Sequence, residues 1–151
     1  MKIQSFDLIF YKGNSWLDKI IKKKLNSRYS HVGLVLDNFH TVETAWNIPL
    51  KIRHFSYRLG DFDRYRIPNL TDEQKERMTL FIQKTLNSKY DFIEILRYFG
   101  FGFKDDKNRY ICISWIDECL KFSGVDVKCD IEVKKFEDLI LKYGLVRINE
   151  Q

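Results

Sequence analysis

The chain contains few of the residues that mark specialised classes of protein. It has only three cysteines and two prolines among its 151 residues. An odd number of cysteines without paired spacing argues against a disulfide framework and favours free thiols in a reducing compartment. Seven glycines leave no low-complexity or repetitive segment to explain. No apolar run approaches the roughly 18–20 residues that a membrane-spanning helix needs.

The first residues also lack the features of a secretory signal. The start, MKIQSFDLIFYKGNS, holds only a short apolar stretch that Asp7 interrupts. It has neither a long hydrophobic region nor a cleavage site of small residues. We therefore expect the protein to stay in the cytoplasm, or to leave the cell through lysis or inside a virion.

The composition is that of a globular protein, with 44% hydrophobic and 31% charged residues. At this length a single domain over residues 1–151 is expected. The net charge of +5 is concentrated in part at residues 19–28, KIIKKKLNSR, which contain no acid. Such a segment is either a solvated helix face or a contact for an anionic polymer or phosphate headgroups, made through Lys22, Lys23 and Lys24. Aromatic residues do not interleave with these lysines, which disfavours nucleic acid.

Hydrophobic periodicity predicts an α+β fold in which a mainly antiparallel sheet, or a small barrel, packs against helices. Ser15 is expected to cap the first helix, and Thr71 with Gln74 forms a capping box for the second. The strands are expected at residues 6–12, 31–37, 40–46, 63–68 and 145–149, and the helices at 15–27, 71–88, 89–100, 113–124 and 133–144.

Cys112 is the cysteine placed best for chemistry. Tyr110 and Ile111 continue an extended apolar run, and a helical pattern begins at about Ile113. A helix N-terminus favours the thiolate form of a cysteine, and its backbone N–H groups can hold an oxyanion. The alternative is a cysteine buried in the core. Cys119, two helical turns further on, is expected in the core, and Cys129 in a polar loop.

A thiolate nucleophile needs a base, and His31 is the best placed of three histidines. His40 falls near a turn and His54 is expected to be exposed. Glu43, an acid within an apolar strand, is suited to orient the imidazole. His31 and Glu43 share a sheet face only if paired residue numbers sum to an even number. A three-residue loop over 37–39 meets this condition, whereas a two-residue turn would separate the pair.

Five segments together resemble a known family. They are FDLIFYKG (6–13), YSHVGLVLD (29–37), TVETAW (41–46), SKYDF (88–92) and YICISWIDECLKFSG (110–124). In this order they are similar to the circularly permuted branch of the NlpC/P60 superfamily, the YiiX/YaeF-like proteins with a papain-like fold. The chain departs from the pattern at three residues. The family usually has serine in place of Ile113 and glycine in place of Phe6 and Ser88.

The resemblance implies roles for individual residues. Cys112 corresponds to the nucleophile, His31 to the base and Glu43 to the orienting residue. The neighbouring Tyr29, Ser30 and Tyr110 are expected to contact substrate. No metal and no cofactor are implied, since no two cysteines have the short spacing of a zinc site.

The expected function is therefore that of a cysteine peptidase or amidase, of phage or bacterial origin, which cleaves amide bonds of peptidoglycan-peptide or γ-glutamyl type. One alternative is a thioesterase or acyltransferase that acts on lipid or acyl substrates. Phe99, Phe101 and Phe103 would then line an apolar groove, or they are core residues or a hydrophobic loop packed over the site. Another is an inactive binding or virion module with the same fold.

Overall fold

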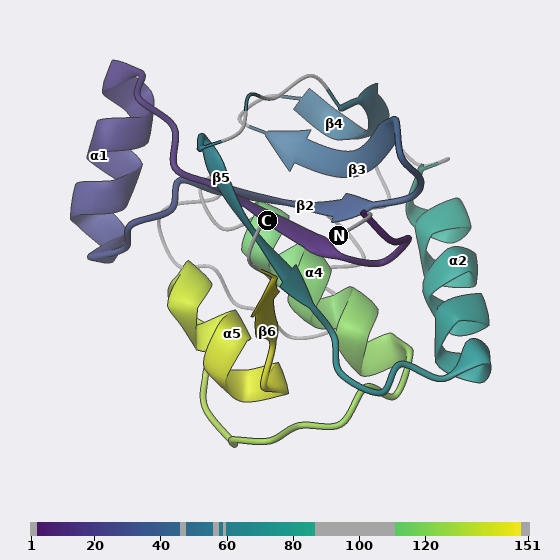
Figure 1. The fold of residues 1–151 in the computed structure, drawn as a ribbon. Coiled ribbons are helices and arrows are strands. Elements are labelled where there is room, and N and C mark those ends of the chain that lie inside the picture. The colour runs from purple at the N-terminus through teal and green to yellow at the C-terminus, as the bar shows by residue number, and fades with distance from the viewer. Residues whose placement is uncertain (1–2, 46–47, 56–57, 59, 87–110, 149–151) are drawn as a thin grey trace.

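The computed structural model describes residues 3–45, 48–55, 58, 60–86 and 111–148 (Figure 1). The helix expected at residues 89–100, together with Tyr110 and the three phenylalanines of the expected acyl groove, lies outside them. The described elements are β1 (Leu8–Tyr11), α1 (Trp16–Leu25), β2 (His31–Val35), β3 (His40–Ala45), β4 (Ile48–His54), β5 (Phe62–Arg66), α2 (Asp72–Leu86), α4 (Ile111–Phe122), α5 (Phe136–Tyr143) and β6 (Val146–Ile148).

The strands form one six-stranded sheet in the order β4-β3-β2-β1-β5-β6. Every neighbouring pair is antiparallel, as the sequence predicts for an α+β fold. β1 lies inside the sheet and is buried on both faces. Its Leu8 and Phe10 belong to the main core, whereas Ile9 and Tyr11 belong to a smaller apolar cluster. Successive strand residues point to opposite faces, which explains this division.

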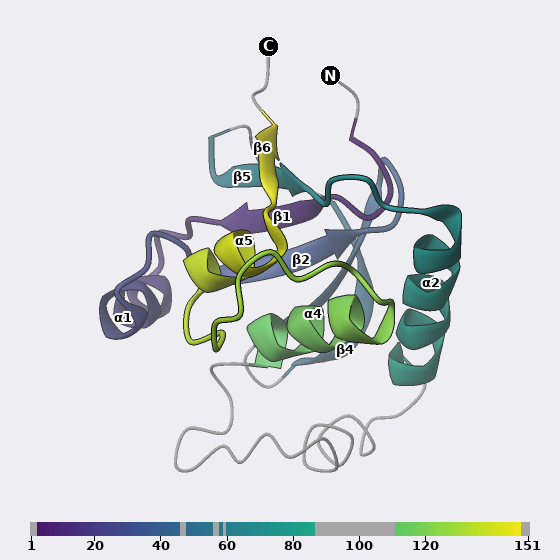
Figure 2. The same cartoon turned by 90° about the horizontal axis from the view of Figure 1, so that it is seen from below.

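The helices cover the sheet unevenly. Figure 2 shows α4 and α5 lying along one face of the sheet, with α1 and α2 at opposite sides of the molecule. The main core fills the space under α4 and α5, where Trp115 and Phe136 are buried, and α2 contributes Met78. In the part of the chain that the structure describes, no helix has both the length and the apolar character to span a membrane.

Both predicted helix starts are confirmed. The Ser15 hydroxyl accepts a hydrogen bond from the Asp18 backbone N–H at 3.1 Å, and the Asp18 carboxylate accepts one from the Ser15 N–H at 2.9 Å. The Thr71 hydroxyl accepts from the Gln74 N–H at 3.2 Å, and the Gln74 amide oxygen accepts from the Thr71 N–H at 3.0 Å. These reciprocal bonds satisfy backbone donors that the first turn of a helix leaves without partners.

Two local expectations are wrong. The strand β4 was not predicted, because Pro49 and the alternating charges of Lys51 and Arg53 obscure its pattern. β4 is an edge strand, where a proline is tolerated. Helix α4 begins at Ile111, two residues before the predicted start at Ile113. The β-branched residues of this run resemble a strand, but packing against the sheet outweighs that weak local preference.

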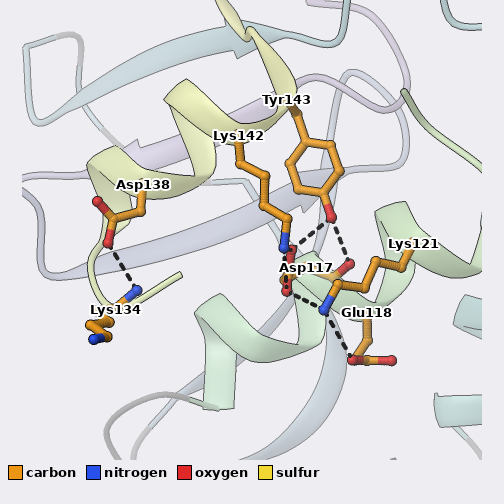
Figure 3. Close-up of polar contacts among 7 residues, drawn as sticks. All are labelled: Asp117, Glu118, Lys121, Lys134, Asp138, Lys142 and Tyr143. Atoms are coloured by element: carbon orange, nitrogen blue, oxygen red, sulfur yellow. Dashed lines mark hydrogen bonds and ion pairs between the residues drawn. The ribbon is translucent and has the colours of Figure 1, made fainter. Parts of the chain in front are cut away.

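A buried polar cluster joins α4 to α5 (Figure 3). Asp117 lies 3.0 Å from the Lys142 ammonium and accepts a hydrogen bond from the Tyr143 hydroxyl at 2.6 Å. Lys121, one turn further along α4, approaches the same carboxylate at 2.8 Å. Because Asp117 has a partner for its charge, it can be buried in the helix interface at acceptable cost. The cluster fixes α5 against the helix that carries Cys112.

Candidate active site

The β2–β3 hairpin brings His31 and Glu43 together. Leu34 pairs with Val42 and Val35 with Thr41, so paired residue numbers sum to an even number, as the three-residue loop requires. Of the two registers that the sequence left open, the structure has the one that places His31 and Glu43 on the same face. As a result, the two side chains emerge on the same face, and His31 Nε2 lies 3.2 Å from Glu43 Oε2.

Glu43 is buried and held by several hydrogen bonds. The hydroxyls of Tyr11 and Thr41 both donate to Oε1, the first at 2.7 Å. Burial alone would raise the pKa of Glu43, but the hydrogen bond and charge of His31, together with the two hydroxyls, lower this pKa to about 2. Glu43 is therefore a carboxylate at neutral pH, oriented toward the imidazole.

Gly33 provides the space that Glu43 occupies. A Cβ atom at residue 33 would lie 2.8 Å from Glu43 Cγ and 3.2 Å from its carboxyl carbon. Real Cβ contacts are not this close, so any side chain at residue 33 would displace the glutamate. The absence of a side chain at Gly33 lets Glu43 lie across β2 and reach the ring of His31.

His31 connects this carboxylate to Cys112. Burial by itself would lower the pKa of His31, but hydrogen bonds with the side chains of Cys112 and Glu43 raise it to about 9. The Tyr11 ring stacks on the imidazole, with centroids 5.2 Å apart and planes inclined by 15°. Because Nε2 is engaged by Glu43, Nδ1 is the ring nitrogen left to exchange a proton with the thiol.

Cys112 occupies the first turn of α4. The first four N–H groups of an α-helix have no acceptor within the helix, so the Cys112 N–H is one that can point at an oxyanion. The residue is 8% exposed and belongs to the main core. Cys112 is therefore as buried as a core cysteine, but it also has an imidazole partner, as a nucleophile does. A purely structural cysteine does not need the hydrogen bond to His31.

Two of the three residues expected to contact substrate are buried in the structure. Tyr29 is fully buried, and its hydroxyl donates to Asp63 at 2.8 Å, so it lies in the core, and the substrate contact expected for it stays a prediction. Ser30 is also buried, with its hydroxyl 3.5 Å from the carbonyl oxygen of Tyr11. Tyr110 lies outside the described residues.

Tyr11 is the site residue that the sequence analysis missed. It ends β1 and pairs directly with His31, and its hydroxyl and its ring contact two different members of the site. The available signal was the alternation of β1, which places Tyr11 on the same face as Ile9. The prediction of a hairpin between β2 and β3 did not include β1, so the neighbour across from His31 was not identified.

The remaining cysteines and histidines lie where the sequence placed them. Cys119 is buried in the core, where burial raises the pKa of its thiol, and Cys129 is exposed. His54 is exposed on β4, and His40 lies beside the hairpin loop with its Nδ1 2.9 Å from Asp37. None of these four residues forms a second pair of a thiol and an imidazole.

The three lysines expected to contact an anionic partner have different surroundings in the structure. The Lys22 ammonium donates to the backbone carbonyls of Lys12 and Gly13, at 2.6 and 2.7 Å. It therefore anchors α1 to the loop after β1. Lys23 and Lys24 are exposed on the same helix, and the anionic partner expected for them stays a prediction.

Hydrogen bonds connect the described side chains around Glu43. Across the described ranges, no three His, Cys, Asp or Glu side chains are grouped so that they could hold a metal ion. Both oxygens of Glu43 already accept hydrogen bonds from Tyr11, Thr41 or His31. A ligand set built on Glu43 would have to break these bonds, so the described residues around Glu43 are arranged as hydrogen-bond partners of this carboxylate.

Comparison with known families and with curated protein sequences finds no match. Among solved structures, the chain is similar to the crystal structure of the metalloprotein YiiX from Escherichia coli O157:H7, with a TM-score of 0.69. The match covers 100% of this chain and 99% of YiiX, at 17% sequence identity. The chain therefore has a YiiX-like α+β fold.

Proposed function

We propose that the protein is a cysteine hydrolase in which Cys112 is the nucleophile, His31 the acid–base residue and Glu43 the residue that orients it. The observation that supports this proposal is the position of the His31 imidazole, which lies 3.2 Å from the Glu43 carboxylate and whose raised pKa reflects the adjacent Cys112 thiol. The three residues come from α4, β2 and β3, and are far apart in the sequence. A core cysteine needs no such arrangement, whereas a thiol nucleophile needs a base and an orienting group.

The proposed reaction proceeds through a thioester. The Cys112 sulfur, with its proton transferred to His31, attacks the carbonyl carbon of the substrate, and the Cys112 N–H stabilises the oxyanion. His31 then gives its proton to the leaving group as the carbonyl reforms. In the second half, His31 takes a proton from water, the resulting hydroxide attacks the thioester, and the sulfur leaves. Glu43 stays ionised and stabilises the imidazolium at both stages.

The proposed substrates are amides of the peptidoglycan-peptide or γ-glutamyl type. This choice rests on the resemblance of the five sequence segments to the permuted NlpC/P60 branch. Acyl thioesters are the alternative substrates, because the same nucleophile and base would also cleave them. Release of free amine from γ-glutamyl peptides, compared with release of thiol from acyl thioesters, distinguishes the two.

Selective thiol labelling tests the reactive residue directly. The full chain is treated with iodoacetamide at mildly acidic pH, and the modified cysteines are identified by peptide mapping. We expect Cys112 to be labelled faster than the exposed Cys129, because an adjacent imidazolium favours the thiolate. Replacement of His31 by alanine should remove this preference.

The two other cysteines provide the controls. Cys129→Ser should leave hydrolysis unchanged, and Cys112→Ala should abolish it. Cys119 should stay unlabelled in the folded protein because it is buried. If Cys129 is labelled faster than Cys112 in the unaltered chain, and His31→Ala leaves the labelling rate of Cys112 unchanged, then Cys112 is not activated.

A further inference from the structure

Helix α1 lies at one side of the molecule, and its polar residues anchor it there. Figures 1 and 2 both show α1 at one edge of the fold. Lys22 is bonded to two backbone carbonyls, and Asp18 caps the first turn. Leu25 is buried, and Ile21 packs against the main core. These contacts determine which face of α1 points inward.

The opposite face of α1 exposes large apolar side chains. Trp16 is 73% exposed and Ile20 is 45% exposed. Residues four apart are neighbours on a helix surface, so the two side chains form one apolar ridge. An amphipathic helix in a soluble protein normally turns its apolar residues inward. Here the inward face is occupied by Ile21, Leu25 and two anchored charged residues, and the tryptophan faces out.

Lysines flank the apolar ridge on both sides. At 100° per residue, Lys19 and Lys23 lie on one side of Trp16 and Ile20, and Lys24 lies on the other. All three lysines are exposed. The one acid of the helix, Asp18, points toward Ser15 and Ser30 on the inward side. The residues that α1 itself presents outward thus combine an aromatic and an aliphatic side chain with positive charge.

We propose that the outward face of α1 docks on an anionic lipid surface. Tryptophan favours the boundary between headgroups and acyl chains, where its ring is apolar and its N–H reaches water. Lysine stems can lie along the apolar boundary while their ammonium groups bind lipid phosphates. An acidic protein groove would match the charge equally, but it would not require the apolar residues to lie at the centre of a convex, projecting helix.

Docking through α1 would also orient the rest of the molecule. α1 follows the end of β1, where Tyr11 lies, and precedes the start of β2, where His31 lies. The end of the sheet that carries the candidate site is therefore the end to which α1 is connected. The docking proposal does not depend on the proposed hydrolase activity, since it rests on the surface of α1 alone.

Co-sedimentation of the full chain with vesicles tests the proposal. Vesicles of phosphatidylcholine alone are compared with vesicles that also contain phosphatidylglycerol, at low and high salt. We expect binding to increase with the anionic lipid and to fall as salt screens the lysines. Replacement of Lys19, Lys23 and Lys24 by glutamine should weaken binding by about fivefold for each lysine removed. Trp16→Ala combined with Ile20→Ala should weaken it by at least about tenfold.

Matched variants on α5 and α2 separate this surface from general stickiness. Leu141→Ala removes an exposed apolar side chain from α5, and Lys75→Gln removes an exposed charge from α2; both should bind vesicles as the unaltered chain does. Brominated lipid should quench part of the tryptophan fluorescence of the unaltered chain, and this quenching should disappear in Trp16→Phe. Equal binding to neutral and anionic vesicles, no binding at low salt, or binding to a DNA duplex or polyglutamate in place of vesicles would overturn the proposal.

Discussion

At the scale of single residues, the candidate site depends on how tightly Glu43 is held. Its oxygens accept hydrogen bonds from two hydroxyls and from His31, and the glycine opposite leaves no spare space. Each contact limits the positions that the carboxylate can adopt. Small substitutions around Glu43 should therefore change the position and the pKa of the His31 imidazole without unfolding the protein.

Gly33→Ala tests the space requirement. The new methyl group would meet Glu43 Cγ at 2.8 Å, so we expect the carboxylate to move away from His31. The rate of Cys112 labelling by iodoacetamide should fall by about tenfold or more, as loss of one charged hydrogen bond would predict. Leu141→Ala, which truncates an exposed side chain on α5, is a useful comparison, because it should leave the labelling rate unchanged. An unchanged labelling rate in Gly33→Ala would mean that Glu43 does not act through His31.

Tyr11→Phe separates the two contacts of Tyr11. Phenylalanine keeps a ring that can stack on His31 but cannot donate to Glu43, whereas Tyr11→Leu removes both interactions. Because a hydrogen bond to a charged group contributes about 1.5–3 kcal/mol, the pKa of Glu43 should rise in Tyr11→Phe. The acid limb of the pH–labelling profile should move to higher pH, more so in Tyr11→Leu. A purely structural role would lower the unfolding temperature without moving this limb.

The residues of the site could be predicted from the sequence to different degrees. His31 and Glu43 were candidates by residue type and by the family resemblance, and strand parity left two choices for whether they share a face. Cys112 followed from its position before a helical pattern. Tyr11 did not, because its partner depends on which strand lies next to β2, and sheet order is a property of the whole chain rather than of a local segment.

At the scale of elements, α4 matters because it carries Cys112. The helix itself was predictable, but its start was not, since Ile111 and Ile113 suit a strand as well as a helix. β4 was missed for the related reason that a proline weakens a strand pattern, although an edge strand tolerates it. Local preferences are weakest at element ends and at sheet edges, where tertiary contacts decide the conformation.

The anchoring of α4 by α5 should be visible in stability. Asp117→Ala would leave the buried Lys142 ammonium without its closest carboxylate. Breaking a buried ion pair from one side typically costs about 3–5 kcal/mol, so we expect a loss of this size in the free energy of unfolding by urea. Glu73→Ala, which breaks the exposed pair with Arg77 on α2, should have little effect. Equal losses in the two variants would contradict the structural role of the Asp117 cluster.

At the scale of the whole molecule, the candidate site and the outward face of α1 lie at related positions in one fold. β1, β2 and α4 meet where the candidate site forms, and α1 is inserted between β1 and β2. The similarity to YiiX over the whole chain at 17% identity shows that the same fold forms from a very different sequence. Function must therefore be read from the few side chains at the end of the sheet and on α1, not from the fold.

The charges of the site should make the stability of the whole fold depend on pH. The pKa of His31 rises from an ordinary 6.5 to about 9, so its contribution is complete below pH 6.5 and disappears as pH rises through about 9. The pKa of Glu43 falls from 4.5 to about 2, so its contribution is present above pH 4.5 and disappears as pH falls through about 2. The pair should therefore stabilise the protein most between these two ordinary values.

Urea unfolding of the unaltered chain and of His31→Gln, across this pH range, measures that contribution. We expect the difference in unfolding free energy to be largest near pH 5.5, at most about 3 kcal/mol, and to shrink steadily above neutrality. Glutamine can still donate to Glu43 but cannot carry the charge, so the pH-dependent part of the difference reports the imidazolium. His54→Gln, on the exposed edge strand, should show no such trend. A difference that grows with pH would mean that His31 is uncharged in the folded protein, and that Cys112 lacks the cationic partner on which the proposed chemistry depends.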